Sequence, residues 1–150
     1  MVLGVAALGA LAGVLMVVTE FLTVASVDVA SGSCEVINDA NPAMADRCSL
    51  SGFERHGGGL LLLGALTLAM TLGASAGGSR PAALALILIG GLVLAFGLFV
   101  DLPETGETGA IGQNFEGAEG SPGPGLYTEL VAGALALGAG LLRLVSDRRR

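Results

Sequence analysis

Four long stretches of this 150-residue chain carry almost no charge. They cover residues 2–27, interrupted by Glu20, and residues 58–76, 81–100 and 126–145. A bilayer core of about 30 Å requires about 20 residues of helix, and each stretch reaches or approaches that length. Backbone groups in lipid must find hydrogen bonds within their own segment, so such runs indicate helices. The sequence therefore predicts one domain, an all-α integral membrane bundle of four transmembrane helices.

The overall composition supports a membrane protein and excludes other classes. Hydrophobic residues make up 53% of the chain, and charged residues make up only 13%. A soluble domain is charged at about 25% of its positions, so this chain has too few charges to cover a water-exposed surface. The apolar excess excludes intrinsic disorder, and the scarcity of basic residues excludes nucleic-acid binding. The lipid bilayer is therefore the first expected partner.

Arginines are distributed unequally between the two sides that four helices would define. The side that holds both termini carries five of them: Arg80, Arg143, Arg148, Arg149 and Arg150. The other side carries Arg47 and Arg55. Basic residues concentrate in cytoplasmic segments, so both termini are predicted to be cytoplasmic in a cell membrane. Residues 28–57 and 101–125 are then two outer loops, extracellular or periplasmic, rich in acidic residues.

Both cysteines of the chain, Cys34 and Cys48, lie in the first outer loop. An oxidising outer face permits a disulfide, and closing a loop of this length stabilises a fold by about 3 kcal/mol. A redox enzyme would need a Cys-x-x-Cys motif, which is absent. His56 is the only histidine, so a thiolate metal site would have a poor set of ligands. We therefore predict a structural disulfide.

Two patterns resemble known proteins. A first outer loop with two cysteines on a four-helix chain is similar in layout to the claudins. This chain has no tryptophan, so it lacks the claudin signature, and the similarity implies the layout alone. Residues 102–106 read LPETG, which resembles the sorting motif cut by sortases. Residues 107–125 separate it from the last helix and no large outer domain precedes it, so Pro103 and Gly106 are interpreted as a helix end and a turn.

Glu20 and Glu129 are the two acidic residues expected inside the membrane, near the outer ends of the first and fourth helices. Ionisable groups in a membrane are costly and indicate function. In one hypothesis the two carboxylates form a cation or proton site. In the favoured alternative, they lie near the interface, where Glu20 pairs with Arg47 or Arg55.

Small residues recur every four positions along three of the predicted helices. Gly9 and Gly13 form a GxxxG motif in the first helix, and similar spacings occur at 65/69/73 and 132/136/140. The third helix contains Gly90, Gly91 and Gly97. Such positions let helix backbones approach closely in lipid. They predict close packing within the bundle, against other membrane subunits, or against a second copy of the chain.

No residue pattern in the sequence predicts catalysis, a cofactor or a metal. The acidic residues Asp101, Glu104 and Glu107 match no calcium-binding loop and are expected to form a solvated turn. The absence of lysine, with abundant alanine, glycine and leucine, suggests a GC-rich bacterial genome. The favoured hypothesis is a non-enzymatic structural or accessory membrane subunit. The alternative is a small oligomeric protein that conducts ions or solutes and uses its outer-leaflet carboxylates.

Overall fold

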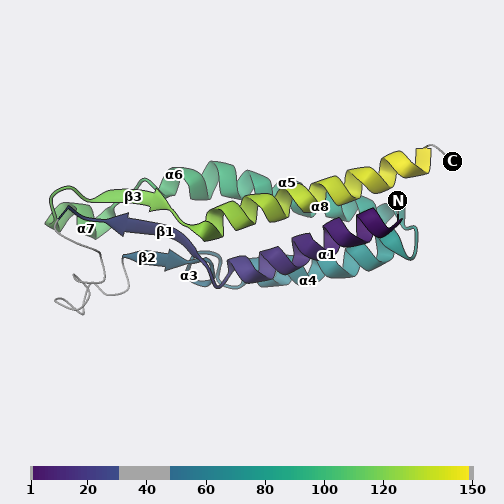
Figure 1. Ribbon diagram of the computed structural model, residues 1–150, viewed down its shortest axis with the longest axis horizontal. Helices are drawn as coiled ribbons and strands as arrows, with labels where there is room; N and C mark the ends of the chain where they lie inside the picture. Colours follow the sequence, from purple (N-terminus) through teal and green to yellow (C-terminus); the bar gives the residue numbers. More distant parts are fainter. Residues whose placement is uncertain (1, 31–47, 149–150) are drawn as a thin grey trace.

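A computed structural model describes residues 2–30 and 48–148, and these residues form an elongated molecule (Figure 1). The chain is mostly helical, at 73%. Helices α1 (Val2–Thr19), α4 (Gly59–Ser75), α5 (Arg80–Phe96) and α8 (Pro124–Arg148) pack into a bundle. The start of α1 and the end of α8 lie at one end, the terminal end. A small sheet lies at the opposite end, the sheet end.

Among the residues that the structure describes, three helical segments are long and apolar enough to cross a membrane. They are Val2–Thr19, Arg80–Glu104 and Pro124–Asp147, while α4 is apolar but has only 17 residues. The expectation of membrane-spanning helices is thus confirmed for three segments. The third and fourth predicted helices were too short, because the third segment extends to Glu104 and the fourth begins at Pro124.

The distribution of side chains in the bundle is the reverse of that in a soluble protein. Large apolar residues such as Leu3, Leu72 and Leu88 are at least 70% exposed. Small residues such as Ala12 and Ala136 are fully buried. Lipid tails are as apolar as leucine, so helices in a bilayer gain most by placing small residues at their contacts. The described bundle therefore has the surface of a membrane protein.

Several of the predicted small-residue grooves are contacts inside the bundle. A Cβ built on Gly64 of α4 would lie 2.8 Å from the carbonyl oxygen of Gly13 in α1. A Cβ on Gly140 of α8 would lie 2.6 Å from the carbonyl oxygen of Ala83 in α5. Real Cβ atoms do not approach backbone this closely, so these positions can hold only glycine without the helices moving apart. The prediction of close packing is confirmed for these pairs.

The all-α prediction was wrong at the sheet end. The first helix does not continue to residue 27 but ends at Thr19, and residues Thr23–Asp28 form strand β1. Strands β2 (Ser49–Ser51) and β3 (Glu119–Pro122) pair with opposite edges of β1, both antiparallel. The physical reason is that β1 lies beyond the bundle, where adjacent segments supply its hydrogen bonds and where Val24 and Val27 turn inward.

The predicted outer loops 28–57 and 101–125 are therefore largely structured. Helix α3 (Gly52–His56) precedes α4, and a π-helical turn, η2 (Gly97–Asp101), joins α5 to α6 (Leu102–Glu104). Pro103 sits in the first turn of α6, where its missing N–H is tolerated, so the helix ends only at Glu104. Helix α7 (Gly109–Asn114) places Ile111 against Val27 and Cys48. Cys34 lies outside the described residues, so the Cys34–Cys48 disulfide stays a prediction.

Candidate functional site

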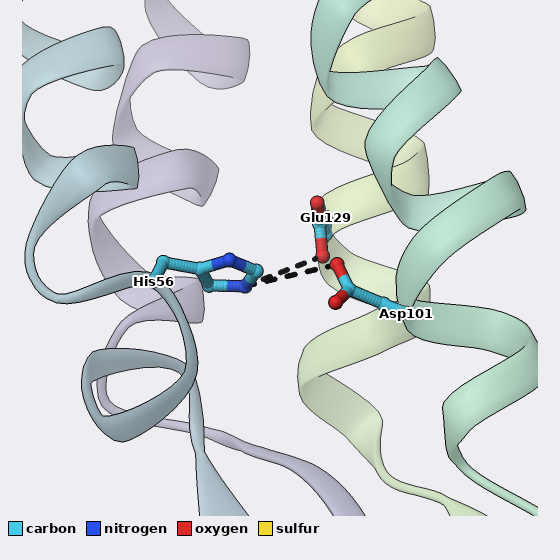
Figure 2. Close-up of side chains that lie close together, drawn as sticks. All are labelled: His56, Asp101 and Glu129. Atoms are coloured by element: carbon cyan, nitrogen blue, oxygen red, sulfur yellow. Dashed lines mark ion pairs between the residues drawn. The ribbon is translucent and has the colours of Figure 1, made fainter.

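Three ionisable side chains from three different segments meet inside the sheet end of the bundle (Figure 2). They are His56 of α3, Asp101 of η2 and Glu129 of α8, and we call them the His–carboxylate cluster. The Nε2 atom of His56 lies 3.7 Å from Oε2 of Glu129 and 4.0 Å from Oδ2 of Asp101. The side chains are 6%, 1% and 0% exposed for His56, Glu129 and Asp101 respectively, so the cluster is shielded from water.

Local sequence explains why His56 points into the bundle. Ser51 and Glu54 form a reciprocal capping box that starts α3, and the hydrogen bonds from Ser51 lower the pKa of Glu54. Gly57 and Gly58 follow the helix with φ values of 59° and 85°. Glycine adopts this left-handed backbone conformation readily, whereas other residues rarely do so at two successive positions. They reverse the chain between α3 and α4 and leave His56 at the inner side of this turn.

Arg55 connects the cluster to the end of the third membrane segment. Its Nε donates a 2.7 Å hydrogen bond to Oδ1 of Asp101. Its Nη2 forms an ion pair with the carboxylate of Glu104. Burial alone would lower the pKa of Arg55, but the hydrogen bonds and charges of the two carboxylates outweigh burial and raise it. Arg55 is therefore a permanent cation that neutralises part of the negative charge.

The pKa of His56 is lowered from its ordinary value. Burial is the main cause, and the charge of Arg55 adds to it, while the charges of Asp101 and Glu20 act in the opposite direction. Burial disfavours the charged form of an imidazole, so His56 is mainly neutral near pH 7. A neutral imidazole carries a lone pair on one of its ring nitrogens.

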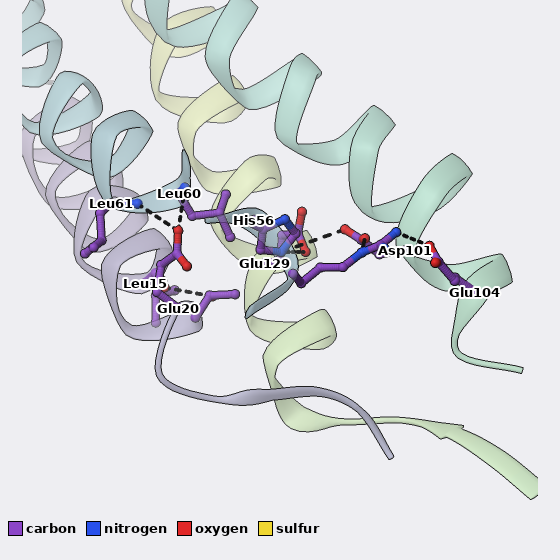
Figure 3. Close-up of polar contacts among 10 residues, drawn as sticks. Leu15, Glu20, His56, Leu60, Leu61, Asp101, Glu104 and Glu129 are labelled. Atoms are coloured by element: carbon purple, nitrogen blue, oxygen red, sulfur yellow. Dashed lines mark hydrogen bonds and ion pairs between the residues drawn. The ribbon is translucent and has the colours of Figure 1, made fainter. Parts of the chain in front are cut away.

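Glu20 has a structural role that neither hypothesis drawn from the sequence included. Its Oε1 accepts hydrogen bonds from the backbone N–H groups of Leu60, at 2.7 Å, and Leu61, at 3.2 Å (Figure 3). Both donors belong to the first turn of α4, whose N-cap residue Gly58 makes no side-chain cap. The carboxylate of Glu20 thus caps α4 from the end of α1. The predicted pairing with Arg55 was wrong, and Arg47 lies outside the described residues.

Several buried atoms in this region make no hydrogen bond to any residue that the structure describes. These atoms are Oε2 of Glu20, Nε2 of His56, Oδ2 of Asp101, and Oε1 and Oε2 of Glu129. Buried polar groups in native proteins almost always find a partner, and an unpaired buried charge is costly. The cluster therefore brings together polar atoms from three side chains that have no hydrogen-bond partner among the described residues.

A cavity of about 340 Å³ lies between α4 and α5 and reaches the cluster. His56 and Glu129 line one part of it, together with Arg55, and apolar side chains that include Leu63, Leu92 and Phe96 line the rest. The ring of Phe96 meets the imidazole edge-on, with centroids 6.0 Å apart. The cavity therefore joins a charged end to an apolar wall, as expected for a binding pocket.

Four exposed aromatic residues surround the same level of the bundle. Phe21, Phe53, Phe99 and Tyr127 are 52–79% exposed. Each lies within three residues of Glu20 or of a member of the cluster. Aromatic rings concentrate where a membrane meets water, and these four exposed side chains are of that kind.

Glu129 lies beside His56 and Asp101, whereas one carboxylate oxygen of Glu20 caps α4. The charge of Glu20 still acts on His56, and the polar site predicted for Glu20 and Glu129 stays a prediction. The prediction that Asp101 belongs to a solvated acidic turn was wrong, because its side chain is fully buried. A sequence signal for Asp101 did exist, since it continues the buried face of the helix four residues after Gly97 and eight after Val93. His56 carried no such signal, because the short segment around it has no helical spacing of apolar residues.

The fold and the site define a helical membrane protein with a buried His–carboxylate cluster beneath a small sheet. Comparison with known proteins adds no identity: no family model, no curated protein and no solved structure matches the chain significantly.

Proposed function

We propose that the protein is a non-enzymatic accessory subunit that crosses the cell membrane four times and packs against another membrane protein. The observation that carries this proposal is a pair of helix positions with no neighbour in the bundle. A Cβ on Gly91 of α5 or on Gly138 of α8 would meet nothing within 4 Å. Other glycines of these helices, such as Gly90, Gly133 and Gly140, lie in close contact with a neighbouring helix of the bundle. Open small-residue positions on a lipid-facing surface suit a partner helix.

The interior of the bundle argues against the alternative, conduction of ions or solutes through a single chain. Met16, Leu86 and Val93 fill the centre and are each at most 1% exposed. Gly90 of α5 and Gly133 of α8 bring two backbones too close for a Cβ. A water-filled path needs polar lining, whereas the ionisable side chains gather at the ends of the bundle. Conduction would therefore require an oligomer with a pore between subunits.

The orientation proposed for the chain places the terminal end in the cytoplasm. Arg143 donates hydrogen bonds there to the carbonyl oxygens of Ala74 and Gly78, which end α4 and the following turn. Arg80 pairs with Asp147 across the same end. Basic side chains that complete helix ends on one side agree with the arginine bias in the sequence. The sheet and the cluster then face the outside of the cell.

A reporter fused to the C-terminus tests this orientation. We expect a cytoplasm-active reporter, such as a fluorescent protein that folds only inside the cell, to be bright. We expect a phosphatase that is active only outside the cytoplasm to be inactive at the same position. A fusion inserted after Gly117, in the predicted second outer loop, should give the reverse result. The opposite pair of results would contradict the orientation.

The accessory role is tested by capture of partners from native membranes. The chain, extracted in mild detergent, is expected to carry one recurrent membrane protein in stoichiometric amount. Gly138→Leu should abolish that association, because the new side chain fills the space for a partner helix. Ala7→Leu, at an exposed position on α1, is the matched control and should retain it. Recovery of the chain alone, or of equal partner with both variants, would contradict the proposal, and recovery of homo-oligomers with ion flux would favour conduction.

A further inference from the structure

We propose that His56, Asp101 and Glu129 bind one divalent transition-metal ion, with Zn²⁺ as the first candidate. This inference goes beyond the accessory role and does not depend on it. The ligands would be Nε2 of His56 and one carboxylate oxygen from each acidic residue. They come from α3, η2 and α8. The ion would therefore join the segment before α4 to the segment after α5 and to the first turns of α8.

The distances between ligand atoms are close to those of a metal site. One potential ligand atom from each residue lies within 4.8 Å of the others. Nε2 of His56 is 3.7 Å from Glu129 and 4.0 Å from Asp101. Tetrahedral Zn²⁺ has bonds of about 2.0–2.2 Å, which separate its ligand atoms by about 3.3–3.6 Å. The two separations from Nε2 would close by about 0.1–0.7 Å, and a separation at the 4.8 Å limit would close by about 1.2–1.5 Å, which side-chain rotation can supply (Figure 2).

The unpaired acidic side chains of the cluster also favour a bound cation. Asp101 uses Oδ1 for Arg55, which leaves Oδ2 without a donor, and Glu129 has no donor for either oxygen among the described residues. The guanidinium of Arg55 pairs with Asp101 and Glu104 and makes no ion pair with Glu129 among the described residues. A buried carboxylate without a close partner is strongly unfavourable. A divalent ion would satisfy three of the four unpartnered atoms of the cluster at once.

The donor set discriminates among metals. Calcium and magnesium prefer oxygen ligands alone, in larger numbers than this cluster supplies. An imidazole nitrogen combined with carboxylate oxygens suits Zn²⁺, Fe²⁺ or Mn²⁺. Three protein ligands leave a fourth position open, and the 340 Å³ cavity that His56 and Glu129 line provides space for water or a small ligand there. Arg55 would orient Asp101 from outside the ligand set.

Metal binding is tested with the full chain in detergent, purified with a tag that lacks histidine and stripped with a chelator. Titration with ZnCl₂, followed by calorimetry and elemental analysis, should show one ion per chain. His56→Gln and Glu129→Gln keep similar side-chain volumes and should weaken binding by more than about tenfold. Glu104→Gln is the matched control, because Glu104 contacts Arg55 but lies outside the proposed ligands, and it should bind as the unchanged chain does.

Two further measurements separate the alternatives. Chain loaded with Cu²⁺ should show nitrogen coupling in pulsed electron paramagnetic resonance, and His56 is the only histidine that can supply it. CaCl₂ and MgCl₂ at the same concentration should fail to displace Zn²⁺. The proposal is overturned by absence of stoichiometric Zn²⁺, by equal binding in Glu129→Gln and Glu104→Gln, or by a spectrum without nitrogen coupling. The spectrum decides the result even if a variant fails to fold.

Discussion

Replacing Glu20 with alanine is expected to destabilise the protein by about 2–5 kcal/mol, because two backbone N–H groups lose their acceptor. Glu20 is fully buried, and its Oε1 is bonded to Leu60 and Leu61 in the first turn of α4. Without the carboxylate, the positive end of α4 is also left uncompensated inside the bundle. The measurement is the free energy of unfolding in mixed detergent micelles, with thermal midpoints as a second readout.

Three control variants test the assignment of this effect to the cap. Glu20→Gln keeps one oxygen acceptor without the charge, so its stability should fall between that of Glu20→Ala and the unchanged chain. Glu107→Ala and Glu116→Ala remove exposed acidic side chains and should change stability by no more than about 0.5 kcal/mol. Equal stability for all four variants would show that Glu20 reaches water and does not cap α4.

Gly90→Ala is expected to destabilise the bundle by about 1–3 kcal/mol or to prevent its assembly, because it forces α5 away from α8. The new Cβ would lie 2.6 Å from the carbonyl oxygen of Gly133 and closer still to the backbone nitrogen of Leu137. Both obstacles are backbone atoms, which cannot rotate away as a side chain can. The damage should appear as a lower resistance to unfolding in detergent.

The adjacent residue provides the matched control for Gly90. A Cβ at Gly91 meets nothing within 4 Å, so Gly91→Ala adds the same group to the same helix without a collision. Alanine is a better helix former than glycine by about 1 kcal/mol, so this variant should be as stable as the unchanged chain or more stable. Similar losses for both variants would show that glycine flexibility, and not close packing, explains the sensitivity of α5.

The sequence predicts the secondary structure correctly where the lipid environment alone determines it. Apolar runs predict helices because a segment in a bilayer must satisfy its own backbone, and three of the four runs have the length for a span. The sequence predicts that residues 23–27 belong to the first helix, because they are as apolar as the residues before them. They form β1 instead, because this segment lies beyond the bundle and pairs with two strands that are remote in sequence.

The candidate site was predictable only in part. Glu20 and Glu129 stand out in the sequence, since each is an acidic residue in an apolar run. Nothing in their immediate neighbourhood indicates that one caps α4 and the other faces His56. Asp101 appeared to be part of an exposed turn because three acidic residues follow one another closely there. The continuation of the helix through η2 to Glu104 buries Asp101 instead.

The sequence by itself determined the class of protein, the approximate helices and some of the small-residue positions at which the helices touch, such as Gly13 and Gly140. These properties depend on local chemistry, namely the transfer of apolar side chains into lipid and the hydrogen bonding of a helix to itself. Only the tertiary structure decided that His56, Asp101 and Glu129 share one buried site and that Glu20 caps a helix 40 residues away. Those contacts depend on how α3, η2 and α8 converge, and a left-handed turn at Gly57 and Gly58 directs one of them.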